Sequence, residues 1–272
     1  MIKLHYYDKY TNLGDILNPI IFKEIFGIHT IKATALDSDV VALGSILDMY
    51  TTHKNPDMHI NDPIHIWGTG FIRENTVNFI RPLIIHALRG IHTKAIIEKS
   101  MGQQINCVLA DPGLLASKLV PKLVYTGEKK YQLGIIPHYI EQNEIIFKQI
   151  QDMHPNSIII DVLADPMENI KLISQCELII SSSLHGLVIA DSFNIPNLWV
   201  KYSDKVIGDG FKFRDYYSSF GLEIATHNLN PHNLKYHLLR LDKIESNYKI
   251  TNQMVAQKQQ DLINCFPVQK GR

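Results

Sequence analysis

The chain has 272 residues, of which 45% are hydrophobic, and its 27 basic side chains balance its 27 acidic ones. A chain of this length and composition buries one large core or two smaller ones, and we expect two. The balanced charge excludes a general attraction to nucleic acid or to an anionic membrane, so any recognition of anions has to be local.

The sequence predicts neither a targeting segment nor a membrane span. Its N-terminus lacks the charged and then apolar order of a signal peptide, and no apolar run approaches the roughly 20 residues that cross a bilayer. We therefore expect a cytoplasmic protein. The cysteines, Cys107, Cys176 and Cys265, lie too far apart to predict a disulfide framework, and no common metal-ligand spacing occurs, so we expect no metal site.

Short apolar runs alternate with amphipathic segments along the first half of the chain. This alternation of β-branched runs and helical segments is typical of a parallel sheet with crossover helices. It predicts a Rossmann-like domain over residues 1–128. We predict strands over residues 2–7, 40–43, 65–67, 83–88 and 106–110, and helices over residues 17–26 and 91–100.

The same pattern restarts after a polar stretch at residues 125–130 and predicts a second Rossmann-like domain over residues 129–230. Two such domains that face one another would bring the carboxyl ends of their strands to a shared cleft, where ligands bind. We predict strands over residues 132–136, 157–162, 178–180 and 197–201, and helices over residues 142–153, 166–175 and 185–193.

The tail, residues 231–272, has helical periodicity through Leu234, Leu238, Leu241 and Ile244. We predict a helix that packs back on the first domain, followed by a frayed basic end.

Residues 177–196 form the most informative segment of the sequence. An apolar strand is followed by three serines, then by the sequence Leu184-His185-Gly186, and then by a helical pattern. This order places His185 at a helix N-terminus, where unpaired amides and the helix dipole favour an anionic ligand. His185 is therefore either a proton donor in an anion site or a residue that helps to cap the helix.

Small and polar residues also follow predicted strands of the first half. Asp15, in the sequence Asn12-Leu13-Gly14-Asp15, fits either a helix N-cap or a functional carboxylate. The loop from Gly68 to Gly70 has backbone amides that could approach a ligand.

Arg89 and Asp111 follow the next two strands. Arginine suits two-point recognition of a carboxylate or phosphate, and the alternative for Arg89 is a surface salt bridge. Asp111, before Pro112 and Gly113, is either an ordinary turn residue or part of the cleft.

Basic side chains follow the last predicted strand, around the sequence Gly208-Asp209-Gly210, and one of them could reach the anion. They are Lys201, Lys205, Lys212 and Arg214.

Taken in order, these motifs resemble those of the polysaccharide pyruvyl transferase family over about residues 4–222. The resemblance implies two Rossmann-like domains in the glycosyltransferase B arrangement, with the acceptor on the N-terminal side and the donor on the C-terminal side. The motifs are Asn12-x-Gly14-Asp15, Gly68-x-Gly70, Arg89-Gly90, Asp111-Pro112, Ser183-Leu184-His185-Gly186 with Ala190-Asp191, and Tyr202-x-x-Lys205.

The resemblance further implies transfer of a pyruvyl group from phosphoenolpyruvate, as donor substrate and without a cofactor, to a sugar of a surface polysaccharide as a cyclic ketal. His185 would be the general acid, and Asp15 is our hypothesis for the base. The implied acceptor is a glycan or a lipid-linked oligosaccharide, which would bring peripheral membrane contact, and nucleic acid is not an expected partner. The implied donor-binding residues are Arg89, Ser183, Gly186 and Lys205.

One departure from the family pattern concerns Ser183, because many members have arginine there. Lys205 or Arg214 would have to compensate for the missing charge. Two other functions stay open: a nucleotide-sugar-dependent glycosyltransferase, in which Glu168 or Asp191 would contact the ribose, and a non-catalytic glycan-binding relative, which the missing arginine favours.

Overall fold

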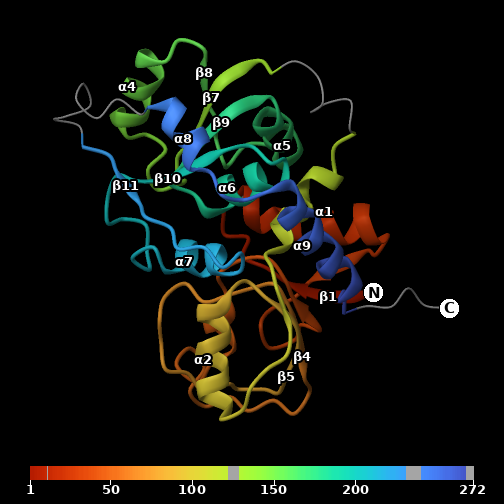
Figure 1. Cartoon of the computed structure of the whole chain (residues 1–272). Coiled ribbons are helices and arrows are strands. Elements are labelled where there is room, and N and C mark those ends of the chain that lie inside the picture. Colours follow the sequence, from red (N-terminus) through yellow and green to blue (C-terminus); the bar gives the residue numbers. More distant parts are fainter. Residues whose placement is uncertain (11, 122–128, 231–239, 268–272) are drawn as a thin grey trace.

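The computed structural model describes residues 1–10, 12–121, 129–230 and 240–267, and two parallel sheets organise them (Figure 1). In the first sheet the strand order is β2-β1-β3-β4-β5-β6, and every pairing is parallel. Its strands are β1 (Ile2–His5), β2 (Thr30–Lys32), β3 (Val40–Val41), β4 (Ile64–Trp67), β5 (Leu83–Leu88) and β6 (Val108–Leu109).

The second sheet has the order β11-β10-β9-β7-β8 and is also parallel throughout. The sequence-based prediction of a mixed α/β fold with two parallel sheets is confirmed. Its strands are β7 (Tyr131–Ile136), β8 (Ser157–Ile159), β9 (Cys176–Ser181), β10 (Asn197–Lys201) and β11 (His227–Asn228).

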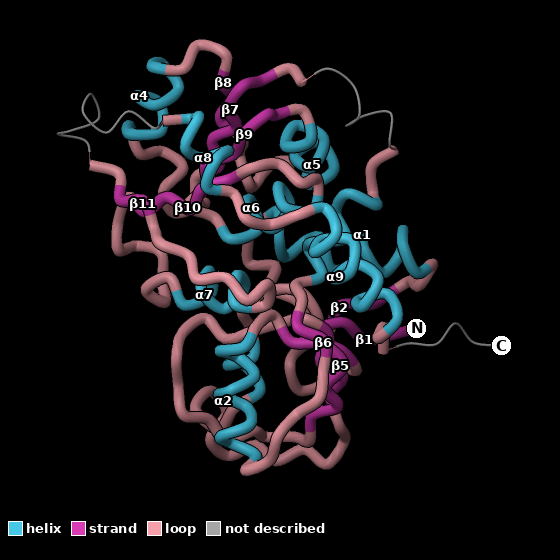
Figure 2. The backbone as a smooth tube through the Cα atoms, viewed as in Figure 1, coloured by secondary structure: helices cyan, strands magenta, loops and turns pink. Residues whose placement is uncertain are grey.

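Helices lie between and around the two sheets (Figure 2). In the first half they are α1 (Leu13–Phe26), α2 (Ile91–Met101) and the short 3-10 helices η1 (Leu47–Tyr50) and η2 (Pro112–Lys118). In the rest of the chain they are α4 (Ile145–Met153), α5 (Pro166–Ser174), α6 (Leu184–Ser192), α7 (Phe211–Ser218), α8 (Leu241–Asn247) and α9 (Asn252–Asn264).

The strand order reverses once in each sheet, between β1 and β3 in the first and between β7 and β9 in the second. At such a switch point the two connections leave toward opposite faces of the sheet, which opens a crevice at the carboxyl ends of the strands. The segments that follow β1, β3, β7 and β9 are therefore the natural place for a ligand.

Helix α1 begins at Leu13, four residues earlier than predicted, because the helix accommodates Pro19. Proline has no N–H, so the carbonyl of Asp15 loses its usual helical donor. The side chain of Asn18 supplies one instead, with Nδ2 2.9 Å from that carbonyl, and also bonds both the N–H and the C=O of Leu43. Asn18 thereby ties the start of α1 to the end of β3.

The second half meets the first through α7, which lies against the N-terminal end of α2 (Figure 1). Asp215 of α7 and Arg89 at the end of β5 are both fully buried, with Arg89 Nε 2.9 Å from Asp215 Oδ2. The same carboxylate accepts from the Thr93 backbone at 2.8 Å and from its hydroxyl at 2.7 Å, so it also caps α2. A side chain at Gly90 would overlap the Asp215 carbonyl, which shows how closely α7 approaches.

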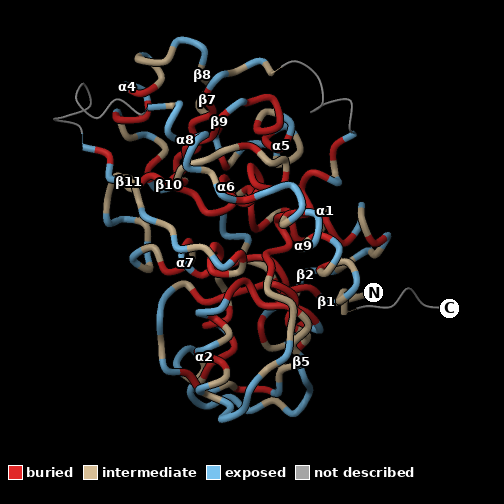
Figure 3. Tube along the Cα trace, in the orientation of Figure 1, coloured by how far each residue is buried: buried red, intermediate tan, exposed pale blue. Residues whose placement is uncertain are grey.

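One apolar cluster continues from the first sheet through α1, η2 and α6 to the second sheet, so the region between the sheets is buried (Figure 3). The predicted boundary at residue 128 falls outside the described residues.

The C-terminal helix that packs on the first half is α9, which lies later than the periodicity suggested. Trp67 Nε1 donates to the Leu262 carbonyl at 3.1 Å, and Phe266 stacks on Phe26 with 3.6 Å between ring centroids. Leu234 and Leu238 lie outside the described residues, and the other two positions of that periodicity, Leu241 and Ile244, belong to the short helix α8.

The three cysteines are free, and burial raises the pKa of each thiol, most strongly for Cys176, to about 12. In the described ranges, no helix is long and apolar enough to cross a bilayer.

The buried ion pair gives the first prediction. Asp215→Asn keeps the size of the side chain but leaves the Arg89 guanidinium buried without its counter-charge, so the protein should lose about 3–5 kcal/mol of stability in urea unfolding. Asp152→Ala, which breaks an exposed ion pair with Lys148, should leave the midpoint unchanged. Equal midpoints for the two variants would mean that the buried pair does not hold the halves together.

Candidate functional site

A cavity of about 460 Å³ lies where the switch points of the two sheets meet. Residues from both halves line it, and most of them follow β1, β3, β7 or β9, as the topology predicts. The lining residues used below are His5, Asn12, Asp15, Ser45, Lys54, Arg73, His138, Tyr139, Ser183, His185 and Lys212.

His185 lies in the first turn of α6, two residues after the N-cap position held by Ser183. Its ring is nearly buried and rests against Gly14, where an added methyl group would overlap the imidazole. Ring Nε2 is 3.7 Å from Asp111 Oδ2, and neither atom has a hydrogen-bond partner among the described residues. Asp111 is fixed in turn by the Gly113 N–H, 2.8 Å from Oδ1.

The Asp111 carboxylate faces one edge of the imidazole, and Gly14 provides the room in which the ring lies. The helix N-terminus beside it favours an anion. An imidazole and a helix N-terminus therefore adjoin in this part of the cavity.

Asp15 lies across the α1–α6 contact from this histidine. It is not an N-cap, because the N-cap position of α1 is Asn12, whose Nδ2 donates to Asp15 Oδ2 at 2.9 Å. Burial raises the pKa of the Asp15 carboxyl, with His185 the largest opposing influence. A carboxylate with a raised pKa is a better proton acceptor than an exposed one.

Lys212, in the first turn of α7, is the cation that the structure places deepest in the cavity wall. Burial, and then the positive charge of Arg89, lower the pKa of its ammonium to about 8, while Asp15 opposes the shift. Lys54 and Arg73 line the same cavity from exposed positions. The sequence indicated Lys212 only as one of four basic residues.

Two further histidines line the cavity as neutral rings. Burial lowers the pKa of His138 to about 3 and that of His5 to about 4. At neutral pH they offer hydrogen bonds and no charge. Neither was predicted, although His138 directly follows the strand over residues 132–136.

Other predicted site residues lie outside the cavity wall. Arg89 is fully enclosed: besides Asp215, its guanidinium donates to Ser45 Oγ and to the Phe71 carbonyl, each at 2.5 Å. The alternative of a surface salt bridge is therefore wrong. Its contact with a donor stays a prediction, and Ser45 is the lining residue through which it would act.

The predicted glycines allow close approach of other groups. Gly68, at φ +90°, leaves room for the Pro112 ring, Gly70 for the Arg89 guanidinium, and Gly186 for Ser181. They shape the walls behind the cavity.

Three of the four basic residues at and after the end of β10 pair with other groups outside the cavity lining. Lys205 is exposed and pairs with Glu144 at 2.5 Å, Arg214 donates to the Asp209 carbonyl, and Lys201 pairs with Asp204 at 2.7 Å. Donor binding by Lys205 stays a prediction.

Comparison with known proteins gives three findings. The family model described as polysaccharide pyruvyl transferase matches residues 1–204. An uncharacterized protein (L143) of Acanthamoeba polyphaga mimivirus is 28% identical over 229 residues, which is 82% of this chain and 75% of the viral protein. The succinoglycan biosynthesis protein ExoV of Rhizobium meliloti (strain 1021) is 27% identical over 139 residues, 51% of this chain and 41% of ExoV.

The contact between Gly14 and His185 is testable by a double-mutant cycle. In the parent, Gly14→Ala should overpack the site, which costs about 1–3 kcal/mol of stability. The better helix propensity of alanine offsets up to about 1 kcal/mol of this loss. In a His185→Ala background the same change should be neutral or stabilising. Urea unfolding measures both, and an identical effect in the two backgrounds would show that the ring does not rest on Gly14.

The lowered pKa of Lys212 predicts a pH dependence of anion binding. Sulfate, whose own charge is constant above neutral pH, should bind more weakly as pH rises through about 8, because Lys212 loses its charge there. Lys212→Met should weaken binding at pH 7 by at least about tenfold and abolish this dependence. The matched variant Lys205→Met should behave like the parent; the reverse result in calorimetry would instead support Lys205 as the anion ligand.

Proposed function

Because the chain belongs to the polysaccharide pyruvyl transferase family, we propose that it transfers a pyruvyl group from phosphoenolpyruvate to a sugar of a polysaccharide and forms a cyclic ketal. The relationship to ExoV supports an acceptor of the polysaccharide class. The acceptor would be a glycan or a lipid-linked oligosaccharide, with membrane contact through its lipid.

One observation supports this function most strongly: His185, backed by Asp111, lies at the N-terminus of α6 in a cavity that also holds Lys212. Phosphoenolpyruvate is a small polyanion that needs a proton at its methylene carbon. In the proposed reaction a helix N-terminus and the half-buried Lys212 ammonium bind the anion, and the histidine supplies the proton.

The reaction balances with these groups. The imidazolium gives its proton to the methylene carbon, which becomes a methyl group, and C2 becomes electrophilic. A sugar hydroxyl adds to C2, and its proton passes to the Asp15 carboxylate. The bond between C2 and the phosphate oxygen then breaks, and a second hydroxyl of the same sugar closes the ketal. Asp15 passes the first hydroxyl proton to the departing phosphate, and the proton of the second hydroxyl restores the imidazolium.

Lys212 offers a replacement for the arginine that many family members have at the position of Ser183. Ser183 and Lys212 line the same cavity from α6 and α7. A charge supplied from α7 can serve the same donor as a charge from the α6 N-terminus, since the Coulomb attraction depends on distance and not on which helix carries the cation.

The alternative of a nucleotide-sugar donor finds less support in the described residues. Glu168 is exposed in the first turn of α5 and pairs with Lys171. Asp191 is fully buried and accepts from Tyr216, Tyr248 and Asn197. Neither lines the cavity, so neither is placed to contact a ribose there.

The test of the function is incubation with phosphoenolpyruvate and a panel of glycan acceptors. The proposal expects acceptor-dependent release of phosphate and a pyruvylated product in the mass spectrum. Stabilisation by UDP- or GDP-sugars without any by phosphoenolpyruvate would favour a glycosyltransferase. Glycan binding with no phosphate release would favour a non-catalytic relative.

The general acid has its own prediction. His185→Gln keeps an uncharged hydrogen-bonding side chain, so the variant should fold and bind phosphoenolpyruvate but lose at least about 100-fold in turnover. His154→Gln, a change of the same kind outside the cavity, should leave turnover unaltered. Near-parental turnover of the His185 variant would assign the proton to another group.

A further inference from the structure

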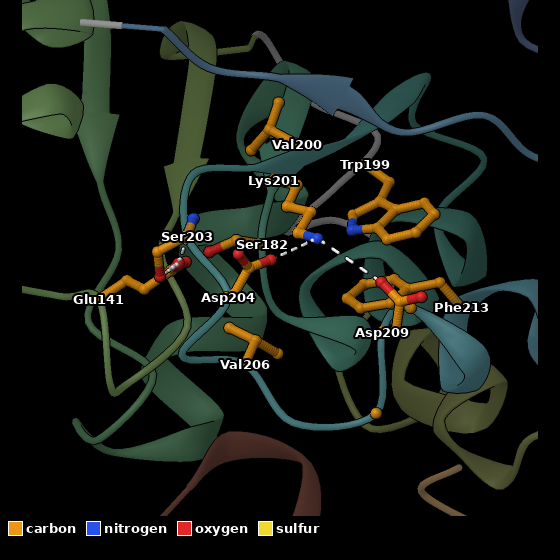
Figure 4. A pocket seen from close by; sticks show the side chains of 12 residues that line it. Glu141, Ser182, Trp199, Val200, Lys201, Ser203, Asp204, Val206, Asp209 and Phe213 are labelled. Atoms are coloured by element: carbon orange, nitrogen blue, oxygen red, sulfur yellow. Dashed lines mark hydrogen bonds and ion pairs between the residues drawn. The ribbon is translucent and has the colours of Figure 1, made fainter. Parts of the chain in front are cut away.

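A second pocket, of about 270 Å³, lies at the carboxyl end of the second sheet (Figure 4). Figure 4 shows Glu141 beside Ser203, Lys201 between Asp204 and Asp209, and Trp199 and Phe213 on the opposite side. Ligand pockets for drug-sized molecules run from about 300 to 1,000 Å³, so this one suits a single small ring.

Glu141 is the unusual residue of this pocket. Its side chain is completely buried, and among the residues that the structure describes it forms no ion pair: Oε1 accepts from the Ser203 N–H at 3.1 Å and from its hydroxyl at 2.6 Å. Its other oxygen, Oε2, has no hydrogen-bond partner among the described residues. A buried carboxylate oxygen without a donor is costly, which points to a ligand that supplies one.

The charges of the pocket restrict the ligand. Glu141, Asp204 and Asp209 outnumber the one lysine, Lys201, which pairs with the two exposed aspartates. An anion such as phosphoenolpyruvate is therefore disfavoured. A metal ion is not indicated either, because the described residues contain no group of three or more side chains that could hold one.

The remaining lining is amphipathic. Ser182 and Ser203 add hydroxyl groups, while Trp199, stacked on Phe213 with 4.4 Å between ring centroids, and Val206 supply an apolar side. A pyranose ring has the matching character, with hydroxyl groups at its edge and C–H groups on its faces.

The pocket adjoins the catalytic cavity through shared segments. The turn after β7 contributes His138 and Tyr139 to the cavity and Glu141 to the pocket. Of the serines after β9, Ser182 lines the pocket and Ser183 lines the cavity. The two spaces are therefore neighbours on the same edge of the sheet.

We propose that this pocket is a sugar subsite, in which Glu141 accepts a hydrogen bond from a hydroxyl group of the acceptor glycan. The assignment to an acceptor rests on the proposed function. It places part of the acceptor on the C-terminal half, so the glycan would reach across both halves.

The test uses Glu141→Gln, whose Oε1 can still accept from Ser203 while an amide group replaces the free oxygen. The probes are the methyl glycosides of glucose, galactose, mannose and N-acetylglucosamine, observed by saturation-transfer NMR. At least one should bind the parent, and the variant should bind it at least about tenfold more weakly. Glu144→Gln, a neighbouring carboxylate outside the pocket lining, is the control and should bind as the parent does.

A second variant, Val206→Trp, fills the pocket from its loop and should abolish binding even if the Glu141 variant folds poorly. The proposal is wrong if no probe binds the parent, or if either variant that folds binds as well as the parent. Phosphate release from phosphoenolpyruvate is measured in parallel. If sugar binding depends on Glu141 but no phosphate is released, only the proposed function is wrong. If phosphate is released but the affinity for the acceptor does not depend on Glu141, only the subsite is wrong.

Discussion

The contact between Asp215 and the start of α2 fixes how the two sheets face one another. One carboxylate neutralises Arg89 and satisfies an N–H at the start of α2, so the burial of both charges depends on the two halves being in register. A misplaced α7 would leave a charge and a helix terminus without partners in a dry environment, which the protein cannot sustain. The cavity follows from this constraint, because the switch points meet only in this orientation.

The chemistry then divides between elements that are distant in sequence. Asp111 comes from the segment after β6, His185 from the start of α6, Asp15 from α1 and Lys212 from α7. No single element carries both His185 and Asp15. Burial lowers the pKa of Lys212 and raises that of Asp15, which are the shifts expected when a cation and a carboxylate share a poorly hydrated space.

Much of the fold could be predicted from the sequence, and the failures have physical causes. Strands β7 and β9 are short, largely buried apolar runs, α5 is amphipathic and starts at a proline, and α6 is apolar and buried on all sides, so their patterns were clear. Strand β2 has three residues, largely exposed on an edge, and α7 mixes lysine and arginine with aromatic residues behind a glycine-rich loop. Neither shows the apolar period of a core element.

The candidate site was predictable in kind but only partly in detail. Asn12, Asp15, Ser183 and His185, which their positions after strands indicated, all line the cavity. It could not separate Lys212 from Lys205, because seven residues of loop and helix decide which of them turns inward. The proximity of Asp111 to His185 likewise depends on how η2 packs on α6, which no local pattern records.

The apolar cluster that continues through both halves also bears on how substrates enter. Proteins that clamp a ligand by hinge bending have domains joined by small, polar interfaces, whereas here Leu114 and Leu115 of η2 belong to the same core as Leu187 and Val188 of α6. Opening the halves would expose this core to water at a cost of roughly 25 cal/mol for each square ångström. A ligand therefore meets a cavity that folding has already assembled, and the core between the two halves stays closed around it.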